Sequence, residues 1–387
     1  MIVLHEDGNL RIRRDGRFLV ASLRRPHRVL STSMVGGGLR EDCTHVVNHQ
    51  SCEPSGDDAA MRRWKALGPE GSHREACGEA GTDPATTALC GTAANMRCAS
   101  LSRRSFEELE VTVVSTAGVE GNATRAGDPA RWHEVETGSR MVEPAELSGT
   151  IVVLGFLSVP CTAGCLTKAS SMLVEAKTAA LWDLRVPSRQ SDRPATGTGT
   201  DQFALASPLA GEGEWERRFS GSHNKLGQIL SEAVHESVSQ ALTLQNGLVP
   251  ELRRSLWAAL GRMGLDAGLL LETAARELPP EACALLAANL QPLAHDPQVA
   301  AAAFALAETQ ELGRAGILGA DALREALASQ AALLASATSL LPARFGSFRG
   351  ALMGTPRPLR EMAAHALVLG FQEKWRKEQG AGLPSDL

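Results

Sequence analysis

Glu175, Lys177 and Asp201 are the charged residues whose surroundings favour chemistry. Glu175 and Lys177 stand in the apolar segment SSMLVEAKTAALWDLRV, residues 170–186, and Asp201 closes the segment ATGTGTD, residues 195–201. A carboxylate or an ammonium group is seldom buried unless it is paired or used, and burial shifts its pKa towards the range that acid–base catalysis needs. The three side chains are therefore candidates for general acid–base work.

The helical period constrains how Glu175 and Lys177 can act together. Residues 165–184 are expected to form a helix, in which positions two apart point to roughly opposite sides. Both charges have apolar neighbours at helical spacing, which is typical of a buried helix. We therefore expect at most one of the two at any single reacting group. The alternative is that each finds a structural partner, or that Lys177 extends its ammonium group to water.

The segment ATGTGTD places small residues and hydroxyl groups in alternation. Glycine lets the backbone approach a ligand closely, and successive N–H groups can form an anion-binding nest. The segment lacks the Gly-Lys-Ser/Thr ending of a P-loop and is not GxGxxG, so it does not indicate nucleotide binding. An ordinary turn capped by Asp201 is the competing interpretation.

Thiol and imidazole groups gather at two places without forming a standard metal motif. One group comprises Cys43, His45, His49 and Cys52, and the other is the CTAGC segment, residues 161–165. Neither spacing matches a common zinc pattern, so we predict no metal. The chain also lacks a GxSxG nucleophile elbow and an HExxH helix.

The elements that must position these residues are short strands mixed with helices. Strands are expected on length and β-branched content at residues 17–23, 27–33, 44–50, 109–117 and 150–157. Helices are expected at about 57–67, 165–184 and 223–244, and loops at 68–84 and 125–140. Because no βαβ rhythm repeats, we predict an α+β fold with a mixed or antiparallel sheet and packed helices.

A second region begins near residue 246. There Ala and Leu dominate, and Asp266, Asp296-Pro297 and Asp321 precede helical segments, as does Pro358. We predict two domains, an α+β domain over residues 1–245 and an all-α helical domain of five or six helices over residues 246–387. The helical domain is expected to mediate homo-oligomerisation or docking of a protein partner.

Composition sets broad limits on partners and location. The chain has 387 residues, 43% of them hydrophobic, and a net charge of −5, which gives no electrostatic basis for nucleic-acid binding. The longest apolar run, VAAAAFALA at residues 299–307, is too short to span a membrane. With no signal-peptide pattern at the start, we expect a soluble cytoplasmic protein whose eight cysteines are reduced.

Six segments in one order resemble the adenosylcobinamide amidohydrolase (CbiZ) family. They are LSTSMVGGGL followed by VVNHQ, CGTAANM, VSTAGVEGNATRAGD, GTIVVLGFL, VEAKTAALWDLRV and ATGTGTDQFALA, and the helix at residues 225–244 matches the end of the family. The resemblance covers about residues 15–245. It implies hydrolysis of the amide between the corrin ring and the aminopropanol arm of adenosylcobinamide, in cobamide salvage, with a corrinoid as substrate and no required cofactor.

Within the matching segments, the residues can be given expected roles from chemistry. Amide hydrolysis needs an activated water, oxyanion stabilisation and an acid for the leaving amine. Glu175 and Asp201 are the candidate bases, and Lys177 is the candidate for oxyanion stabilisation or for protonating the amine. The expected substrate-binding residues are Gly36, Gly37, Asn48, Thr92, Thr116, Gly118, Asn122, Thr198, Gly199 and Thr200.

Several alternatives stay open at this level. Attack by Thr198 or Thr200 ranks below attack by water because no His base is adjacent in sequence. A metal-bound hydroxide would place Cys43, His45, His49 and Cys52 at the site. A corrinoid-binding or sensing protein without catalysis is the main functional rival, and an amidohydrolase for a different amide is the other.

Overall fold

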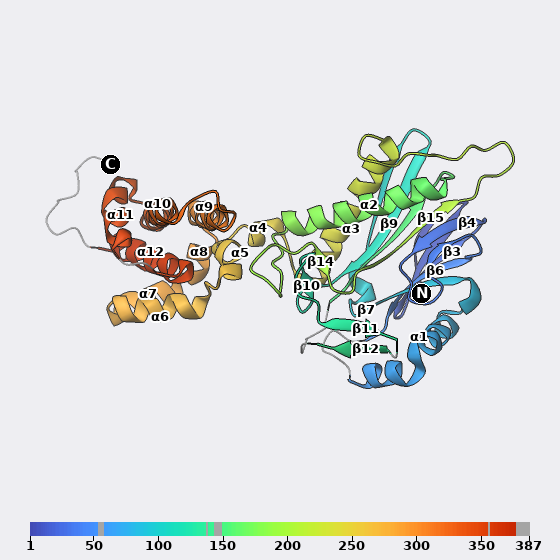
Figure 1. Ribbon diagram of the computed structural model, residues 1–387, viewed down its shortest axis with the longest axis horizontal. Helices are drawn as coiled ribbons and strands as arrows, with labels where there is room; N and C mark the ends of the chain where they lie inside the picture. The colour runs from blue at the N-terminus through green and yellow to red at the C-terminus, as the bar shows by residue number, and fades with distance from the viewer. Residues whose placement is uncertain (53–57, 137, 143–148, 355–356, 377–387) are drawn as a thin grey trace. The chain divides into compact units, whose positions relative to one another are not determined.

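The chain folds into two compact units, Met1–Val249 and Pro250–Leu387, in the computed structural model (Figure 1). The structure describes residues 1–52, 58–136, 138–142, 149–354 and 357–376. Each unit has its own hydrophobic core, so the two are described separately.

The first unit contains a five-stranded sheet, called sheet A, with the strand order β1-β2-β3-β6-β7. Its strands are β1 (Ile2–Glu6), β2 (Leu10–Asp15), β3 (Phe18–Leu23), β6 (His45–Gln50) and β7 (Thr87–Thr92). All neighbours are antiparallel except β6 and β7, which run parallel and are joined by the helix α1 (Asp58–Ala80).

A six-stranded sheet, called sheet B, has the order β5-β4-β15-β13-β9-β8. Its strands are β4 (His27–Ser31), β5 (Gly38–Arg40), β8 (Ser100–Phe106), β9 (Leu109–Ala117), β13 (Ile151–Leu157) and β15 (Gln202–Pro208). Only β13 and β15 are parallel, and the helix α2 (Ala163–Asp183) joins them.

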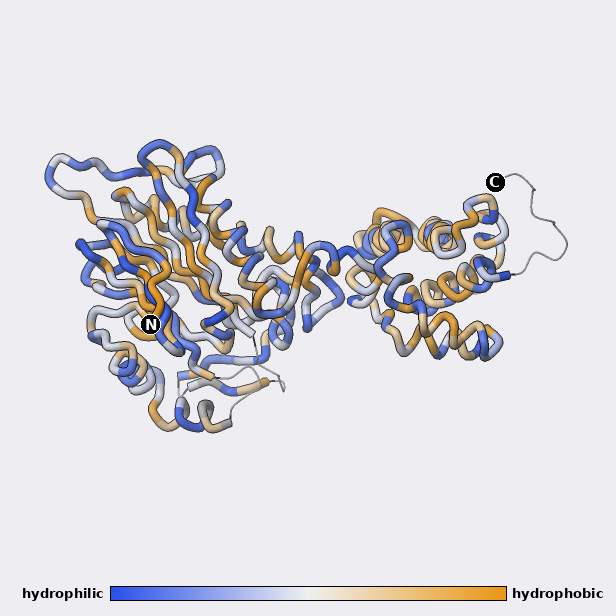
Figure 2. Tube along the Cα trace, turned by 180° about the vertical axis from the view of Figure 1, so that it is seen from behind, coloured by the Kyte–Doolittle hydropathy of each residue, from blue (hydrophilic) through white to orange (hydrophobic). Residues whose placement is uncertain are grey.

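The two sheets pack face to face between helical layers (Figure 1). Strand β13 shows why, because its residues are buried on both faces: Leu154 lies in the core between the sheets, and Val153 packs under the helices. The helices α2 and α3 (Lys225–Asn246) cover the outer face of sheet B, and α1 covers the outer face of sheet A through Ala76 and Ala80. In Figure 2 the strands of the first unit carry many of its hydrophobic stretches, drawn in orange, in agreement with this burial.

Smaller elements complete the first unit. The strand β10 (Ala123–Thr124) pairs with β14 (Gly197–Thr198), and β11 (Trp132–Val135) forms a hairpin with β12 (Gly138–Met141). Short 3-10 turns, η1 (Pro84–Thr86) and η2 (Met96–Cys98), lie on either side of β7.

The predicted α+β class with mixed sheets and a helical C-terminal region is confirmed, but two predicted loops are wrong. Residues 68–80 continue the helix α1 across a kink at Gly68, whose φ is 67°, with Pro69 next in the chain. The Gly-Pro pair therefore bends the helix instead of ending it, because Ala76 and Ala80 gain burial against sheet A. Residues 125–140 include most of the β11–β12 hairpin.

The second unit is helical throughout its described part. Its helices are α4 (Pro250–Arg253), α5 (Leu256–Leu260), α6 (Ala267–Glu277), α7 (Pro280–Ala288), α8 (Leu290–Ala294), α9 (Pro297–Arg314), α10 (Ala320–Ser339), α11 (Phe345–Met353) and α12 (Leu359–Lys374), with the 3-10 turns η3 (Gly261–Met263) and η4 (Pro342–Arg344). These nine α-helices exceed the five or six expected, because short helices such as α4, α5 and α8 leave little periodic signal.

The helix starts follow the capping chemistry of the sequence. Asp266 and Asp296 accept hydrogen bonds from the first turns of α6 and α9. Asp321, in contrast, lies inside the first turn of α10, where its charge suits the helix dipole. Over the described residues, no helix has the length and apolarity needed to cross a membrane.

Because the core clusters of the two units draw on different residues, we predict that residues 1–249 fold without the helical unit. The purified fragment should show far-UV circular dichroism of a mixed α/β protein and one cooperative thermal transition. The control is the full chain, which should unfold with a second transition assigned to residues 250–387. An aggregated or unstructured 1–249 fragment would contradict this independence.

Candidate active site

Polar residues gather at one end of the sandwich, where the two parallel strand pairs meet. The carboxyl ends of β6 and β7 face the beginnings of β13 and β15. Asn48 Nδ2 donates to Thr116 Oγ1 at 2.8 Å, and the Gly91 N–H donates to Gln202 Oε1 at 3.0 Å. These bonds join sheet A to sheet B. We call this region the polar end; it contains Asn48, Thr116, Asn122, Thr150, Lys177, Thr198, Thr200, Asp201 and Gln202.

A buried ion pair forms the centre of the polar end. Lys177, on the inner side of α2, donates from Nζ to Asp201 Oδ2. The side chains are only 10% and 17% exposed, respectively. A charge buried to this degree requires a partner, so each residue stabilises the burial of the other.

Asp201 accepts three further hydrogen bonds. Its Oδ1 accepts from the Thr198 hydroxyl at 2.5 Å and from the Ile151 N–H at 3.1 Å, and its Oδ2 accepts from the Thr198 N–H at 3.0 Å. Charge-assisted hydrogen bonds of this kind are stronger than neutral ones, so together they hold the carboxylate in one orientation. Thr198, Asp201 and Lys177 therefore form one hydrogen-bonded chain.

Gly197 leaves the space in which the hydrogen-bonded group of Thr198, Asp201 and Lys177 forms. A Cβ atom at position 197 would lie 2.4 Å from Asp201 Oδ2 and 2.7 Å from Lys177 Nζ. Both distances are shorter than a real Cβ atom shows, so a larger residue at position 197 would force the Asp201 carboxylate or the Lys177 ammonium group to shift. The second glycine of the TGTGTD segment, Gly199, has a Cβ position 3.0 Å from Asn122 Oδ1.

The helix α2 holds the Gly-Thr segment by three side chains. Besides the bond from Lys177, Thr178 Oγ1 donates to the Thr196 carbonyl at 2.9 Å, and Trp182 Nε1 donates to the Ala195 carbonyl at 3.0 Å. The segment is therefore fixed along its length to a helix whose other residues pack on sheet B.

A second hydrogen-bonded group lies beside the ion pair. Thr150 Oγ1 and Thr200 Oγ1 are 2.7 Å apart, and Asn122 Nδ2 donates to Thr200 Oγ1 and to the Gly149 carbonyl, both at 3.1 Å. Thr200 and Gly199 are exposed, whereas Asn122 is buried. Two exposed residues thus lie next to the buried pair, while the Thr200 hydroxyl itself is bonded to Thr150, Asn122 and the Gly149 carbonyl.

Asn48 has an unused acceptor. The residue is fully buried, and no described group donates to its Oδ1. Thr116, its partner, is also fully buried. Asn48 and Thr116, both predicted to bind the substrate, are therefore buried beneath the surface of the polar end, where they help to hold its other residues in place.

Glu175 lies away from this group, which corrects the expectation that α2 is buried on all sides. Its side chain is 62% exposed and 4.0 Å from Lys168 Nζ. The exposed stripe of α2 contains apolar residues, Val174 and Trp182, which hid the amphipathic pattern in the sequence. Lys177 does point to a different side of the helix from Glu175, as the spacing predicted.

The remaining predicted binding residues lie in a turn or at the ends of strands. Gly36, whose φ is 60°, and Gly37 belong to the β4–β5 turn, and a Cβ at Gly37 would meet the Ser33 carbonyl oxygen at 2.2 Å. The turn itself thus requires these glycines, and contact with a ligand stays a prediction. Thr92 Oγ1 accepts from the Ala94 N–H at 3.0 Å, and the Gly118 N–H donates to the Thr150 carbonyl at 3.1 Å.

The thiol and imidazole candidates do not converge. Cys43 lies in the core between the sheets, whereas His49 faces the other side of sheet A and stacks on Phe18 at 4.6 Å. Burial lowers the pKa of His49 to about 4, so its imidazole is neutral near pH 7. Among the described residues, Cys43, His45, His49 and Cys52 form no group within ligand distance of a common ion.

Cys161 and Cys165 of the CTAGC segment do lie together, at the start of α2. The hydrogen bond between the two thiols lowers the pKa of Cys165 to about 7 and raises that of Cys161. Both side chains are fully buried. They lie at the opposite end of the sheet B strands from the polar end, so the length of those strands separates the two places. They are therefore separate from the Lys177–Asp201 pair.

Sequence reasoning missed three contributors to the polar end: Gly197, Thr150 and Gln202. Each lies in a segment that the resemblance had already singled out, but none carries a charge or a distinctive spacing. It also missed that the Asp201 carboxylate accepts from the Thr198 hydroxyl, because that contact depends on the turn from residue 198 to residue 201. A hydroxyl, an adjacent carboxylate and an orienting ammonium group are the components of an activated hydrolytic site.

Comparisons with known proteins agree on the first unit. A family model described as adenosylcobinamide amidohydrolase matches residues 4–250. An uncharacterized protein of Methanocaldococcus jannaschii is 30% identical over 168 residues. That alignment covers 41% of this chain and 64% of the relative, so the chain spans just under two thirds of the relative's length.

Gly197→Ala should break the polar end, because its Cβ overlaps both Asp201 and Lys177. We expect a loss of about 1–3 kcal/mol or more in the free energy of unfolding, measured by urea denaturation. The matched control is Gly164→Ala in the first turn of α2, where nothing lies within 4 Å of the added Cβ. It should be neutral or slightly stabilising. Equal stability of the two variants would contradict the close approach.

Proposed function

Because the chain belongs to the adenosylcobinamide amidohydrolase family, we propose that it hydrolyses the amide joining the corrin ring to the aminopropanol arm of adenosylcobinamide. The products are adenosylcobyric acid and 1-amino-2-propanol, and the reaction serves cobamide salvage. The observation that carries the proposal is the hydrogen-bonded group of Thr198, Asp201 and Lys177, which lies within the matched residues 4–250 and near the exposed residue Thr200.

In the proposed mechanism Asp201 is the general base and a water molecule is the nucleophile. The water forms a bond to the amide carbon and gives its proton to Asp201 Oδ1, for which the Thr198 hydroxyl rotates away or relays the proton. Thr198 Oγ1 is the donor suited to this exchange because the other two contacts to Asp201 from residues 151 and 198 are fixed backbone N–H groups. The proton then passes to the leaving nitrogen, and the C–N bond breaks.

Lys177 has the electrostatic role. Its ammonium group is held beside Asp201 in a site largely shielded from water, where a positive charge stabilises the developing oxyanion more strongly than in bulk solvent. It also keeps Asp201 oriented. Glu175, exposed and beside Lys168, takes no part in the proposed reaction.

The exposed residues of the polar end are proposed to bind the substrate. Corrinoids carry amide arms around an apolar ring, and Thr200 and Gly199 are the exposed residues that such arms would contact. Asn122 orients Thr200 through its Nδ2. Asn48 and Thr116 act as positioning residues, since both are fully buried.

A corrinoid-binding protein without catalysis is the second candidate, and one observation favours it. Asp201 already accepts four hydrogen bonds, one of them from a lysine, so neither of its oxygens can take a proton until a donor is displaced. In that case the polar end would bind the corrinoid and release no aminopropanol.

Asp201→Asn should abolish hydrolysis of adenosylcobinamide, whereas Glu175→Gln should retain wild-type turnover. We expect at least a 100-fold loss for the first variant, because the amide cannot accept the proton. Mass spectrometry of released adenosylcobyric acid measures the reaction, and thermal unfolding shows whether each variant is folded. Loss of activity in Glu175→Gln with activity retained in Asp201→Asn would reverse the assignment. A folded wild-type protein that binds the corrinoid but releases no product supports the second candidate.

The nucleophile is tested at Thr198. If water attacks, Thr198→Ala should retain turnover reduced by about 10–100-fold, and acid-quenched wild-type protein should show no covalent adduct by intact mass. Thr198→Ser, which keeps the hydroxyl, should restore most of the rate. A corrinoid acyl adduct on Thr198 would contradict water attack and make Thr198 the nucleophile of the same reaction.

A further inference from the structure

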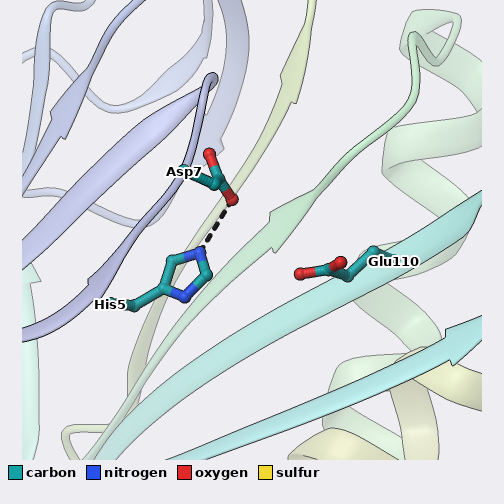
Figure 3. Close-up of side chains that lie close together, drawn as sticks. All are labelled: His5, Asp7 and Glu110. Carbon is teal, nitrogen blue, oxygen red and sulfur yellow. Dashed lines mark hydrogen bonds and ion pairs between the residues drawn. The ribbon is translucent and has the colours of Figure 1, made fainter.

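The opposite end of the sandwich carries a second cluster, formed by His5, Asp7 and Glu110 (Figure 3). His5 is in β1, Asp7 follows it in the β1–β2 turn, and Glu110 is the second residue of β9. Thr116 of the polar end lies six residues further along β9, roughly 20 Å away for an extended strand. The cluster is therefore separate from the proposed catalytic group.

The three side chains present ligand atoms to one another. His5 Nε2 and Asp7 Oδ2 are 2.7 Å apart, and the ligand atoms of all three residues lie within 4.8 Å of one another. In Figure 3 the Glu110 carboxylate points towards the imidazole and Asp7 from the opposite side. The His5 side chain is only 6% exposed, so it is held between the sheets and cannot turn freely into solvent.

Each carboxylate is oriented through one oxygen and leaves the other available. Asp7 Oδ1 accepts from the N–H groups of Asn9 at 2.6 Å and Leu10 at 2.9 Å, which leaves Oδ2 facing His5. Glu110 Oε1 accepts from Arg103, and no described group of the chain donates to its Oε2. Outer hydrogen bonds that fix ligand orientation in this way are typical of protein metal sites.

The separations fit a small divalent ion. A tetrahedral zinc ion with bonds of about 2.1 Å holds its ligand atoms about 3.4 Å apart. The present values, 2.7 Å for one pair and at most 4.8 Å for the others, bracket that spacing. One imidazole and two carboxylates, with water as the fourth ligand, form a nitrogen–oxygen set that suits zinc better than Mg²⁺ or Ca²⁺.

We propose that His5, Asp7 and Glu110 bind one Zn²⁺ ion, which fastens the β1–β2 hairpin at the edge of sheet A to strand β9 of sheet B. The ion takes the place of the proton between His5 and Asp7 and recruits Glu110 through its free oxygen. Its two positive charges balance the two carboxylates. The site is structural and lies outside the proposed amidohydrolase reaction.

The full chain, without an affinity tag and stripped by a chelator, is titrated with Zn²⁺ by calorimetry, and the metal retained after dialysis is measured by mass spectrometry. We expect about one ion per chain and a rise in the melting temperature on adding zinc. Glu110→Gln should weaken binding at least ten-fold and abolish the rise. The matched control is His235→Gln, because His235 pairs with Asp183 at 2.8 Å without a third ligand in the described part of the chain, and this variant should bind like the wild type.

A second measurement identifies the ligands even if a variant is unstable. Co²⁺ bound to the wild-type chain should give the absorption of a nitrogen–oxygen site and no thiolate-to-cobalt charge-transfer band. A thiolate band, which would assign the metal to cysteines, overturns the proposal. So does an absence of zinc uptake by the wild type, or equal uptake by Glu110→Gln and the wild type.

Discussion

The architecture of the polar end depends on one interaction, the ion pair between Lys177 and Asp201. Neither charge is stable in this largely dry position alone, so the helix α2 and the beginning of β15 are held together by it. The pair keeps its present position because residue 197 has no side chain, since a Cβ atom there would displace one of the two groups. Thr178 and Trp182 extend the same attachment along the Gly-Thr segment. The strands, the helix and the turn are therefore fixed relative to one another by the group that the proposed chemistry uses.

A face-to-face pair of sheets raises a second constraint, which explains the buried polar residues. Polar side chains between sheets must satisfy one another, and the bonds from Asn48 to Thr116 and from Gly91 to Gln202 do so across the sandwich. The same bonds bring the carboxyl ends of one parallel pair to the beginnings of the other. Asn48 Oδ1 accepts no hydrogen bond from the described groups, which lowers the stability of the fold. The other bonds of the buried polar residues make this part of the structure rigid behind the site.

The sequence predicts those features that local pattern determines. The strand at residues 109–117 and the helix α2 follow from β-branched content and helical spacing, and the spacing alone separates Glu175 from Lys177. It does not show which of the two is buried, because Val174 and Trp182 place apolar surface on the exposed stripe. The partners of Thr198 and Lys177 are contacts across turns and between layers, and they exist only once α2 packs on sheet B. The first part of α1 was predicted, but its continuation after Gly68 was missed because Gly68-Pro69 resembles a helix end.

Structure and proposed catalysis make opposite demands on Asp201. Four donors occupy its two oxygens and so fix the turn, whereas a base must have a lone pair free for a proton. Two of the four donors are backbone N–H groups, which cannot move away from Asp201 without disrupting β13 or the turn. If Lys177 moved away, its ammonium group would be buried without a partner. The Thr198 hydroxyl is the donor that can rotate at little cost. A substrate that displaces this hydroxyl would therefore free Asp201 Oδ1 at the moment when a water molecule is to be activated, and the pair would keep its structural role throughout.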